Sequence, residues 1–151
     1  MSLNWRQFEL GVLRPAQENE AEVAIKLVGE TIWHESDRLR ALGQYVKNGD
    51  SFVFGPGRGI CSMERNTWRW LQARPDGQWA DNREYEELAW DLRLNVIACR
   101  MRYKAYPAPL PLLEDGIQAR ALYWLKAYNG TNVTERLSNY ITNAKAIPWV
   151  K

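Results

Sequence analysis

The sequence has few of the residues that build metal centres and disulfide frameworks. Its 151 residues include one histidine and two cysteines, Cys61 and Cys99, which form no C-x-x-C pair. A zinc site would have to use carboxylates in place of the cysteine and histidine ligands that zinc usually takes. We therefore expect no metal and no cofactor, and we expect both thiols to be buried structural residues.

Long apolar runs are also lacking. No segment approaches the ~18 consecutive apolar residues that cross a bilayer, so we expect no membrane span. Residues 1–13 carry polar and charged side chains throughout and have no apolar centre of the kind found in secretory signals. We therefore expect synthesis in a cytoplasm without an export signal.

The chain lacks an excess of charge of one sign. It has 20 Lys and Arg against 18 Asp and Glu, a formal net charge of +2. This falls short of the basic stripe that is typical of nucleic-acid binders. Arg93, Arg100 and Arg102 could form such a face on one helix, but we interpret them as the solvated side of a packed helix and expect no nucleic-acid partner.

The residues that are present describe an ordinary globular chain. Hydrophobic residues make up 46% and charged residues 25%, and the length suits a single domain over residues 1–151. Eight Trp and seven Tyr are many for this length. Most should pack in the core, although flat aromatic faces also line carbohydrate-processing clefts.

Apolar residues recur with helical spacing over most of the sequence, which predicts a mainly α fold. Helices are expected over residues 5–13, 20–35, 63–71, 81–106, 114–127 and 132–144. Asn19 is expected to cap the second of these helices, and Asn132 with Glu135 has the form of a capping box for the last. A left-handed cap near Asn129 and Gly130 should end the fifth.

Helical periodicity disappears over residues 36–59, where several glycines and Pro56 punctuate the chain. The only strand-like run there is residues 51–54. We expect a long irregular loop with, at most, a small hairpin.

Glu35 is the clearest candidate in the sequence for acid–base chemistry. It follows four apolar residues at spacings of four and three, Ala21, Ile25, Val28 and Ile32, and so extends the apolar stripe of its helix. Partial burial there favours the neutral carboxyl and raises its pKa, as a general acid requires. The alternative is an ordinary surface glutamate at a helix end, which composition alone favours.

Three motifs follow one another in an order that resembles a known superfamily. They are Glu35-Ser36, then G-R-G-I-C-S-M-E at residues 57–64, then A-Y-N-G at residues 127–130. Soluble lytic transglycosylases and goose-type lysozymes have E-S, G-x-x-G-[LI]-x-Q and A-Y-N-A-G in the same order. The chain is most similar to small phage-encoded proteins of that lysozyme-like type.

The resemblance implies a lysozyme-like single domain that cleaves the bond between N-acetylmuramic acid and N-acetylglucosamine in peptidoglycan. Glu35 would be its general acid and base. The partners implied are bacterial peptidoglycan and other virion proteins. Such a protein would be made in the host cytoplasm or carried in the virion, and would act on the cell wall.

The resemblance also implies a glycan cleft, lined here by Gly57, Gly59, Ser62, Glu64, Tyr128 and Asn129. Glycine would let the backbone pass close to a sugar, although a plain flexible loop is the alternative. Tyr128 would hydrogen-bond the catalytic carboxyl or a sugar, and Asn129 an N-acetyl group. Capping of the preceding helix by Asn129 and Gly130 is a further role that can hold at the same time.

A second carboxylate is less evident, and a single-Glu transglycosylase needs none. Asp37, Asp50 and Glu64 are the local candidates. Asp37 follows Glu35 too closely to face it, and Asp50 has the sequence context of a turn residue. Glu64 stands at the start of a predicted helix, where a negative side chain is favoured in any case.

Two positions depart from the family pattern. Ser62 replaces the usual Gln and loses the reach of its amide, and Thr131 follows Gly130 where A-G is usual. These changes leave open a virion structural or adaptor protein of the same fold that binds glycan without cleaving it.

Overall fold

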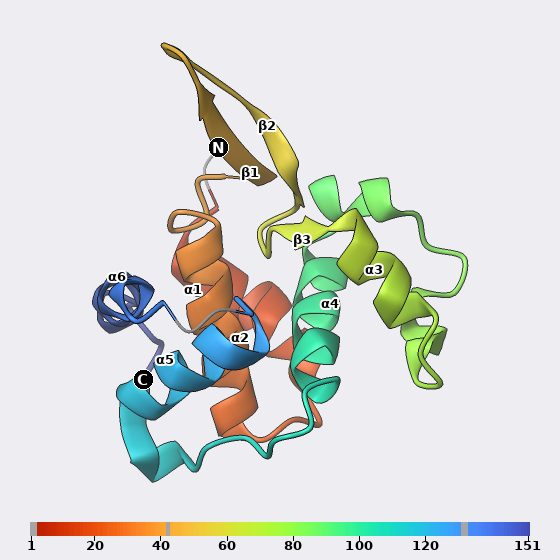
Figure 1. The fold of residues 1–151 in the computed structure, drawn as a ribbon. Coiled ribbons are helices and arrows are strands. Elements are labelled where there is room, and N and C mark those ends of the chain that lie inside the picture. Colours follow the sequence, from red (N-terminus) through yellow and green to blue (C-terminus); the bar gives the residue numbers. More distant parts are fainter. Residues whose placement is uncertain (1–2, 42, 131–132) are drawn as a thin grey trace.

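Helices account for most of the computed structural model, which describes residues 3–41, 43–130 and 133–151 (Figure 1). The α-helices are α1 (Trp5–Phe8), α2 (Glu22–Glu35), α3 (Arg65–Gln72), α4 (Leu92–Lys104), α5 (Gly116–Ala127) and α6 (Glu135–Lys145). A π-helical segment, Glu9–Leu13, continues α1, and short 3-10 helices cover Pro15–Gln17, Gly77–Ala80, Tyr85–Ala89 and Leu113–Asp115. The predicted mainly α class is confirmed.

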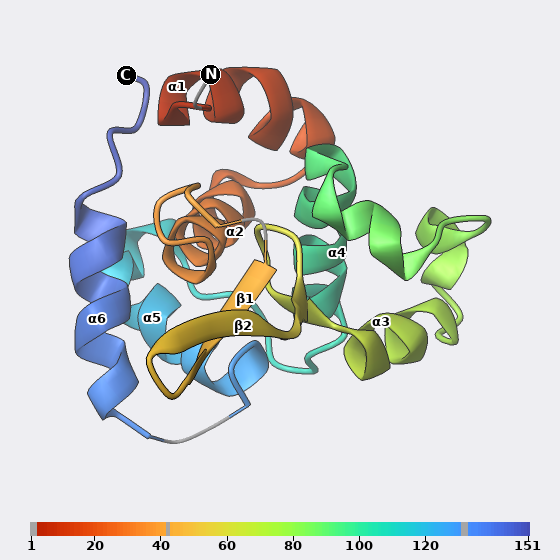
Figure 2. The same cartoon turned by 90° about the horizontal axis from the view of Figure 1, so that it is seen from above.

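Helix α2 lies at the centre of the molecule, between α6 and α4 in both views (Figures 1 and 2), and it also packs against α5. Its predicted stripe is buried at Ile25, Val28 and Ile32, whereas Ala21 is exposed. Apolar side chains from all these helices join α2 in one continuous core. The stripe therefore faces the core of the protein, as its spacing predicts.

The start of α2 differs from the prediction. The helix begins at Glu22 with Ala21 in the cap position and no side-chain cap, so Asn19 does not cap it. Glu20 instead forms an ion pair of 2.8 Å with Arg100 of α4. The helix thus begins two residues later than predicted, and the local sequence does not reveal the long-range ion pair of Glu20.

Residues 43–64 form a three-stranded antiparallel sheet where a long irregular loop was predicted. Its strands are β1 (Gly43–Asn48), β2 (Ser51–Arg58) and β3 (Met63–Glu64), in the order β1-β2-β3. The predicted hairpin is present but longer than residues 51–54, and it projects from the helical body in Figure 1. Residues 63 and 64 were predicted as helix and are strand instead.

A tertiary contact explains why the Gly-Pro-Gly segment is extended. The hydroxyl of Tyr85 lies against the carbonyl oxygens of Pro56 (2.7 Å) and Met63 (2.8 Å). It thereby links β2 to β3 from a residue more than twenty positions away. Local turn propensity at Gly55 and Gly57 cannot reveal this contact.

The prediction of a single helix over residues 81–106 is wrong for the first half of that range. A 3-10 helix, Tyr85–Ala89, occupies that half, and α4 begins only after Asp91. The side chain of Asp91 accepts a hydrogen bond of 2.8 Å from the backbone N–H of Leu94, which is a helix N-cap. Apolar residues keep helical spacing across this break, so the spacing alone predicts one continuous helix.

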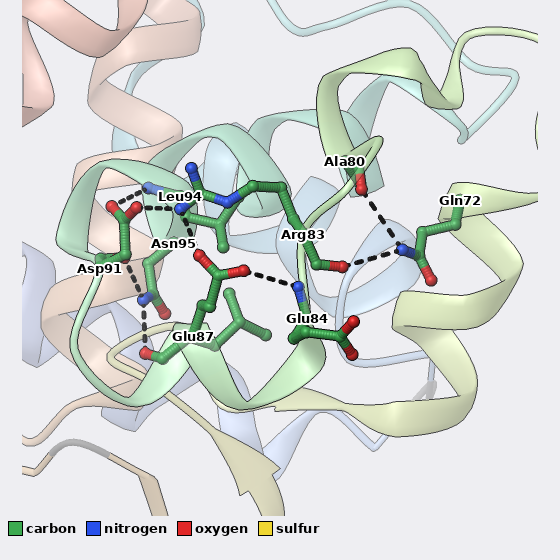
Figure 3. Close-up of polar contacts among 9 residues, drawn as sticks. Gln72, Ala80, Arg83, Glu84, Glu87, Asp91, Leu94 and Asn95 are labelled. Carbon is green, nitrogen blue, oxygen red and sulfur yellow. Dashed lines mark hydrogen bonds and ion pairs between the residues drawn. The ribbon is translucent and has the colours of Figure 1, made fainter.

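Further polar contacts hold the break in place (Figure 3). Arg83 forms ion pairs with Glu87, at 2.9 Å, and with Asp91. The side-chain amide of Gln72, from α3, donates to the carbonyl oxygens of Ala80 and Arg83 at 3.4 Å. These contacts satisfy backbone groups and carboxylates that a continuous helix would place elsewhere.

The two C-terminal helices and the two cysteines agree with the sequence pattern in part. Helix α5 begins at Gly116, two residues later than predicted, and Gly130 after it has the expected left-handed φ of 69°. Thr134 precedes α6 without a side-chain cap, and Asn132 of the predicted capping box lies outside the described residues, as does Thr131. Cys61 and Cys99 are buried free thiols, as predicted.

In the part of the chain that the structure describes, no helix combines the length and apolar character needed to cross a membrane.

Candidate active site

Glu35 is the last residue of α2, and the chain leaves the helix sharply after it. The buried hydroxyl of Ser36 donates to the carbonyl oxygen of Ile32 (2.6 Å) and accepts from the N–H of Leu39 (2.9 Å). Residues 37–39 then adopt positive φ angles of 47°, 62° and 64°. This run of left-handed non-glycine residues is uncommon, and it turns the backbone away directly behind Glu35.

The carboxyl group of Glu35 is tuned toward the protonated form. Burial raises its pKa to about 7, while Trp124, Arg102 and Arg136 act in the opposite direction. Among the described residues the indole nitrogen of Trp124 has no partner with good hydrogen-bond geometry, and it lies beside the carboxyl as a polar neighbour. Desolvation therefore prevails over two nearby positive charges.

A polar cavity of about 360 Å³ lies in front of Glu35. Four residues expected at a glycan cleft line it together with Glu35, namely Ser62, Glu64, Tyr128 and Asn129. They come from the β2–β3 connection, the end of β3 and the segment after α5, so the fold brings the three sequence motifs to one place.

The same cavity has three further lining residues that sequence reasoning did not single out, Thr67, Arg102 and Arg136. The sequence pattern instead predicts a solvated helix face for Arg102. Local sequence does not mark Thr67 or Arg136 as site residues, because membership of a cavity depends on how α3 and α6 pack.

Gly57 and Gly59 were expected beside the substrate, but neither lines this cavity. Gly57 lies in β2 and pairs with Glu64 of β3. Gly59 has a φ of 71°, and a Cβ there would lie 2.0 Å from Oδ1 of Asn95 and 2.5 Å from the carbonyl oxygen of Leu88. Its glycine is therefore required for close packing against α4.

Asn95 of α4 anchors the loop that carries Ser62. This fully buried side chain donates to the carbonyl oxygens of Leu88 (2.7 Å) and Asp91 (2.8 Å). Its Oδ1 accepts from the backbone N–H of Cys61 at 3.3 Å. Ser62, with a φ of 48°, then places its hydroxyl 3.4 Å from the carbonyl oxygen of Glu35, to which it donates.

Tyr128 has a different partner from the one expected. Its hydroxyl donates to the carbonyl oxygen of Cys61 at 2.5 Å, so its proton is not directed at Glu35. The guanidinium of Arg102 lies over the Tyr128 ring, 4.2 Å from its centre, and also donates to the Tyr128 carbonyl oxygen. Tyr128 thus supports the cavity wall and orients Arg102.

Asn129 is oriented by the last helix. Its side-chain oxygen accepts a hydrogen bond of 2.9 Å from Arg136 of α6. The two side chains form one edge of the cavity, where the amide group of Asn129 and the remaining N–H groups of Arg136 can act as donors.

Among the three candidate second carboxylates, only Glu64 shares the cavity with Glu35. Asp37 is exposed and pairs with Arg40 at 3.1 Å, and Asp50 lies exposed at the hairpin turn. Glu64 itself is exposed at the entrance of α3. A second carboxylate is therefore present at the site, and it is one of the three that the sequence offers as candidates.

Two smaller hollows share lining residues with the cavity, and we call the cavity and these two hollows together the groove. One, of about 190 Å³, shares Thr67 and Arg102 with it and adds Trp70 and Tyr106. The other, of about 260 Å³, shares Glu35, Asn129 and Arg136 and adds His34 and Trp124. Glu35 lines both the cavity and the second of these hollows.

A larger hollow of about 540 Å³ lies between residues 4–6 and 148–151 and has no Asp, Glu or His in its lining. Within the described ranges, no three His, Cys, Asp or Glu residues are grouped so that they could hold a metal ion. The groove around Glu35 is therefore the candidate active site.

Comparison with known proteins does not assign the chain to a family, because no family model, curated protein or solved structure matches it.

Proposed function

We propose that this protein is a peptidoglycan-degrading muramidase of the lytic transglycosylase type, with a lysozyme-like fold and Glu35 as its general acid and base. The observation that carries the proposal is the position of Glu35 at the end of a buried helix, where its carboxyl lines a polar cavity and burial raises its pKa to about 7. A buried acid at the end of a helix, facing a groove, can deliver a proton at neutral pH.

In the proposed reaction, Glu35 donates its proton to the oxygen that links N-acetylmuramic acid to N-acetylglucosamine. The bond from that oxygen to the muramic C1 breaks, and the positive charge that develops on the sugar is spread over C1 and the ring oxygen. The Glu35 carboxylate then accepts the proton of the muramic 6-hydroxyl as this oxygen bonds to C1. The product is a 1,6-anhydro sugar.

A hydrolytic outcome differs in the nucleophile and in its need for a second carboxylate. Water then takes the place of the 6-hydroxyl, and a second carboxylate stabilises the charged sugar or activates the water. Glu64 is the candidate for that role, because it lines the same cavity.

The groove also supports an oligosaccharide substrate. Trp70 is about half exposed, at 51%, and together with Tyr106 it lines the hollow of about 190 Å³. Aromatic faces of this kind pack against the apolar faces of sugar rings. Virion-borne delivery to the cell wall, with other virion proteins as partners, is part of the same proposal and rests on the phage-type resemblance.

Purified protein incubated with bacterial sacculi tests the proposal. Wild type should release muropeptides, Glu35→Gln should release none, and the released products should be weighed by mass spectrometry. Anhydro-muropeptides identify a transglycosylase and reducing ends a hydrolase. Glu64→Gln should leave anhydro products unaffected but reduce hydrolytic ones. No release by wild type between pH 4 and pH 8 would overturn the proposal.

A second candidate function is a virion adaptor that binds glycan without cleaving it. Its support is the commitment of the Tyr128 hydroxyl to Cys61, together with Ser62 in place of the family's Gln. Both reduce the donors that face a substrate. Binding to sacculi that is equal in wild type and Glu35→Gln, with no turnover by either, would favour this function.

A further inference from the structure

Two positive charges flank Glu35 in the groove, and they come from different helices. Arg102 belongs to α4 and Arg136 to α6, and both line the cavity. Among the described residues, neither forms an ion pair with a carboxylate of the chain, in contrast to Arg14, Arg100 and Arg120.

Both guanidinium groups are held by neutral acceptors. Arg102 donates to the carbonyl oxygen of Tyr128 and lies over its ring, and Arg136 donates to the side-chain oxygen of Asn129 at 2.9 Å. A guanidinium carries five N–H donors in a planar fork that suits a carboxylate. Each side chain therefore has a defined orientation and several donors to spare.

The charge balance of the cavity favours an anion. Its acidic residues are Glu35 and Glu64, and Glu64 lies exposed at the rim. Glu35 must be neutral to act as an acid, which leaves two positive charges against one negative charge. Arg102 and Arg136 both lower the pKa of Glu35, so an anion that pairs with them would help to keep Glu35 protonated.

We infer that Arg102 and Arg136 form a binding site for a carboxylate carried by the muramic acid residue of the substrate. That carboxylate belongs to the stem peptide or, on a strand without peptides, to the lactyl group. The inference rests on the proposed function and deepens it, because it makes the enzyme selective for an anionic glycan over a neutral one.

Binding to the Glu35→Gln protein tests the inference without turnover. Four tetrasaccharide ligands are titrated by calorimetry: one with L-Ala–D-Glu stems, one with the same stems amidated, one without peptide, and neutral chitotetraose. The free-acid ligand should bind about tenfold more tightly than its amidated form if the stem supplies the carboxylate. Tight binding of the peptide-free ligand assigns the contact to the lactyl group instead.

Variants in the same background identify the site. Arg136→Gln and Arg102→Gln should each reduce the tenfold preference for the carboxylate ligand by about threefold, and Arg136→Lys should restore part of it. Arg93→Gln, an exposed position on α4 outside the cavity, removes the same charge and should have no effect. Thermal unfolding verifies that each variant is folded.

Equal binding of all four ligands overturns the inference, as does a preference that survives both arginine substitutions or is lost equally in Arg93→Gln. The proposed function fails independently of this result. If wild type cleaves no sacculi but the arginine-dependent preference persists, the carboxylate site stands and the enzyme does not. If wild type cleaves sacculi but shows no such preference, the proposed enzyme stands and the carboxylate site does not.

Discussion

The hydroxyl of Tyr128 donates a hydrogen bond of 2.5 Å to the carbonyl oxygen of Cys61. Cys61 is thereby held from both sides, because its N–H donates to Asn95 of α4. Ser62 follows directly and carries the hydroxyl that reaches the end of α2. The position of one groove wall thus depends on contacts between α4, the loop and the segment after α5.

Tyr128→Phe should destabilise the protein by about 1–3 kcal/mol, because it leaves a buried carbonyl without its donor. Urea denaturation measures the change in the free energy of unfolding. Tyr123→Phe is the matched control, since its hydroxyl donates to the exposed carbonyl oxygen of Ala108, where water can replace it. Equal losses in the two variants would contradict the importance of the Cys61 contact.

Gly59→Ala should cost several times more stability than Gly49→Ala. Both positions have positive φ, 71° and 61°, so both substitutions carry the same backbone strain, about 1 kcal/mol. At Gly59 the new Cβ would also overlap Asn95 and the Leu88 carbonyl, whereas nothing lies within 4 Å at Gly49. Comparing the melting temperatures of Gly59→Ala and Gly49→Ala separates the cost of backbone strain from the cost of steric overlap. Similar melting temperatures would argue against the packed Gly59 position.

Glu35→Gln should stabilise the protein at high pH. The pKa of Glu35 rises from 4.5 to about 7 on folding, so the folded state holds its proton where the unfolded state has lost it. Stability therefore falls as pH rises from 4.5 toward 7, by roughly 3 kcal/mol in all. The variant should exceed wild type by up to that amount above pH 7 and match it below pH 4.5.

Urea denaturation at pH 4 and pH 8 measures this difference, with Glu114→Gln as the control at an exposed position. Surface substitutions change stability by little. If the free energy of unfolding of Glu35→Gln, relative to that of wild type, is the same at pH 4 and pH 8, the carboxyl is not desolvated.

If the proposed function holds, cleavage of sacculi should decline above pH 7 because Glu35 loses its proton there. The rate should fall about tenfold for each further pH unit. Arg136→Gln removes a charge that lowers the pKa of Glu35, so its alkaline limb should shift to higher pH. Arg93→Gln should leave the profile unchanged, and a wild-type profile flat to pH 9 would exclude Glu35 as the acid.

Local sequence patterns predicted the helical elements well where each helix buries a single face. The stripe of α2 and the left-handed Gly130 are examples, because both depend on spacing or on one residue's backbone preference. The break before α4 was missed, since apolar spacing runs across it while Arg83 and Asp91 hold it open. Strand β2 was missed beyond residue 54 because Tyr85 contacts Pro56 over a long sequence distance.

The sequence by itself determined that Glu35 ends a buried stripe, and that Ser62, Glu64, Tyr128 and Asn129 are candidates to accompany it. Only the tertiary structure decided what faces its carboxyl. Arg102 and Arg136 reach the groove from α4 and α6, and Gly59 is directed into packing against Asn95 instead. The reason is physical: periodicity reports which side of a helix is buried, whereas a groove is formed by side chains from several elements whose relative placement depends on long-range packing.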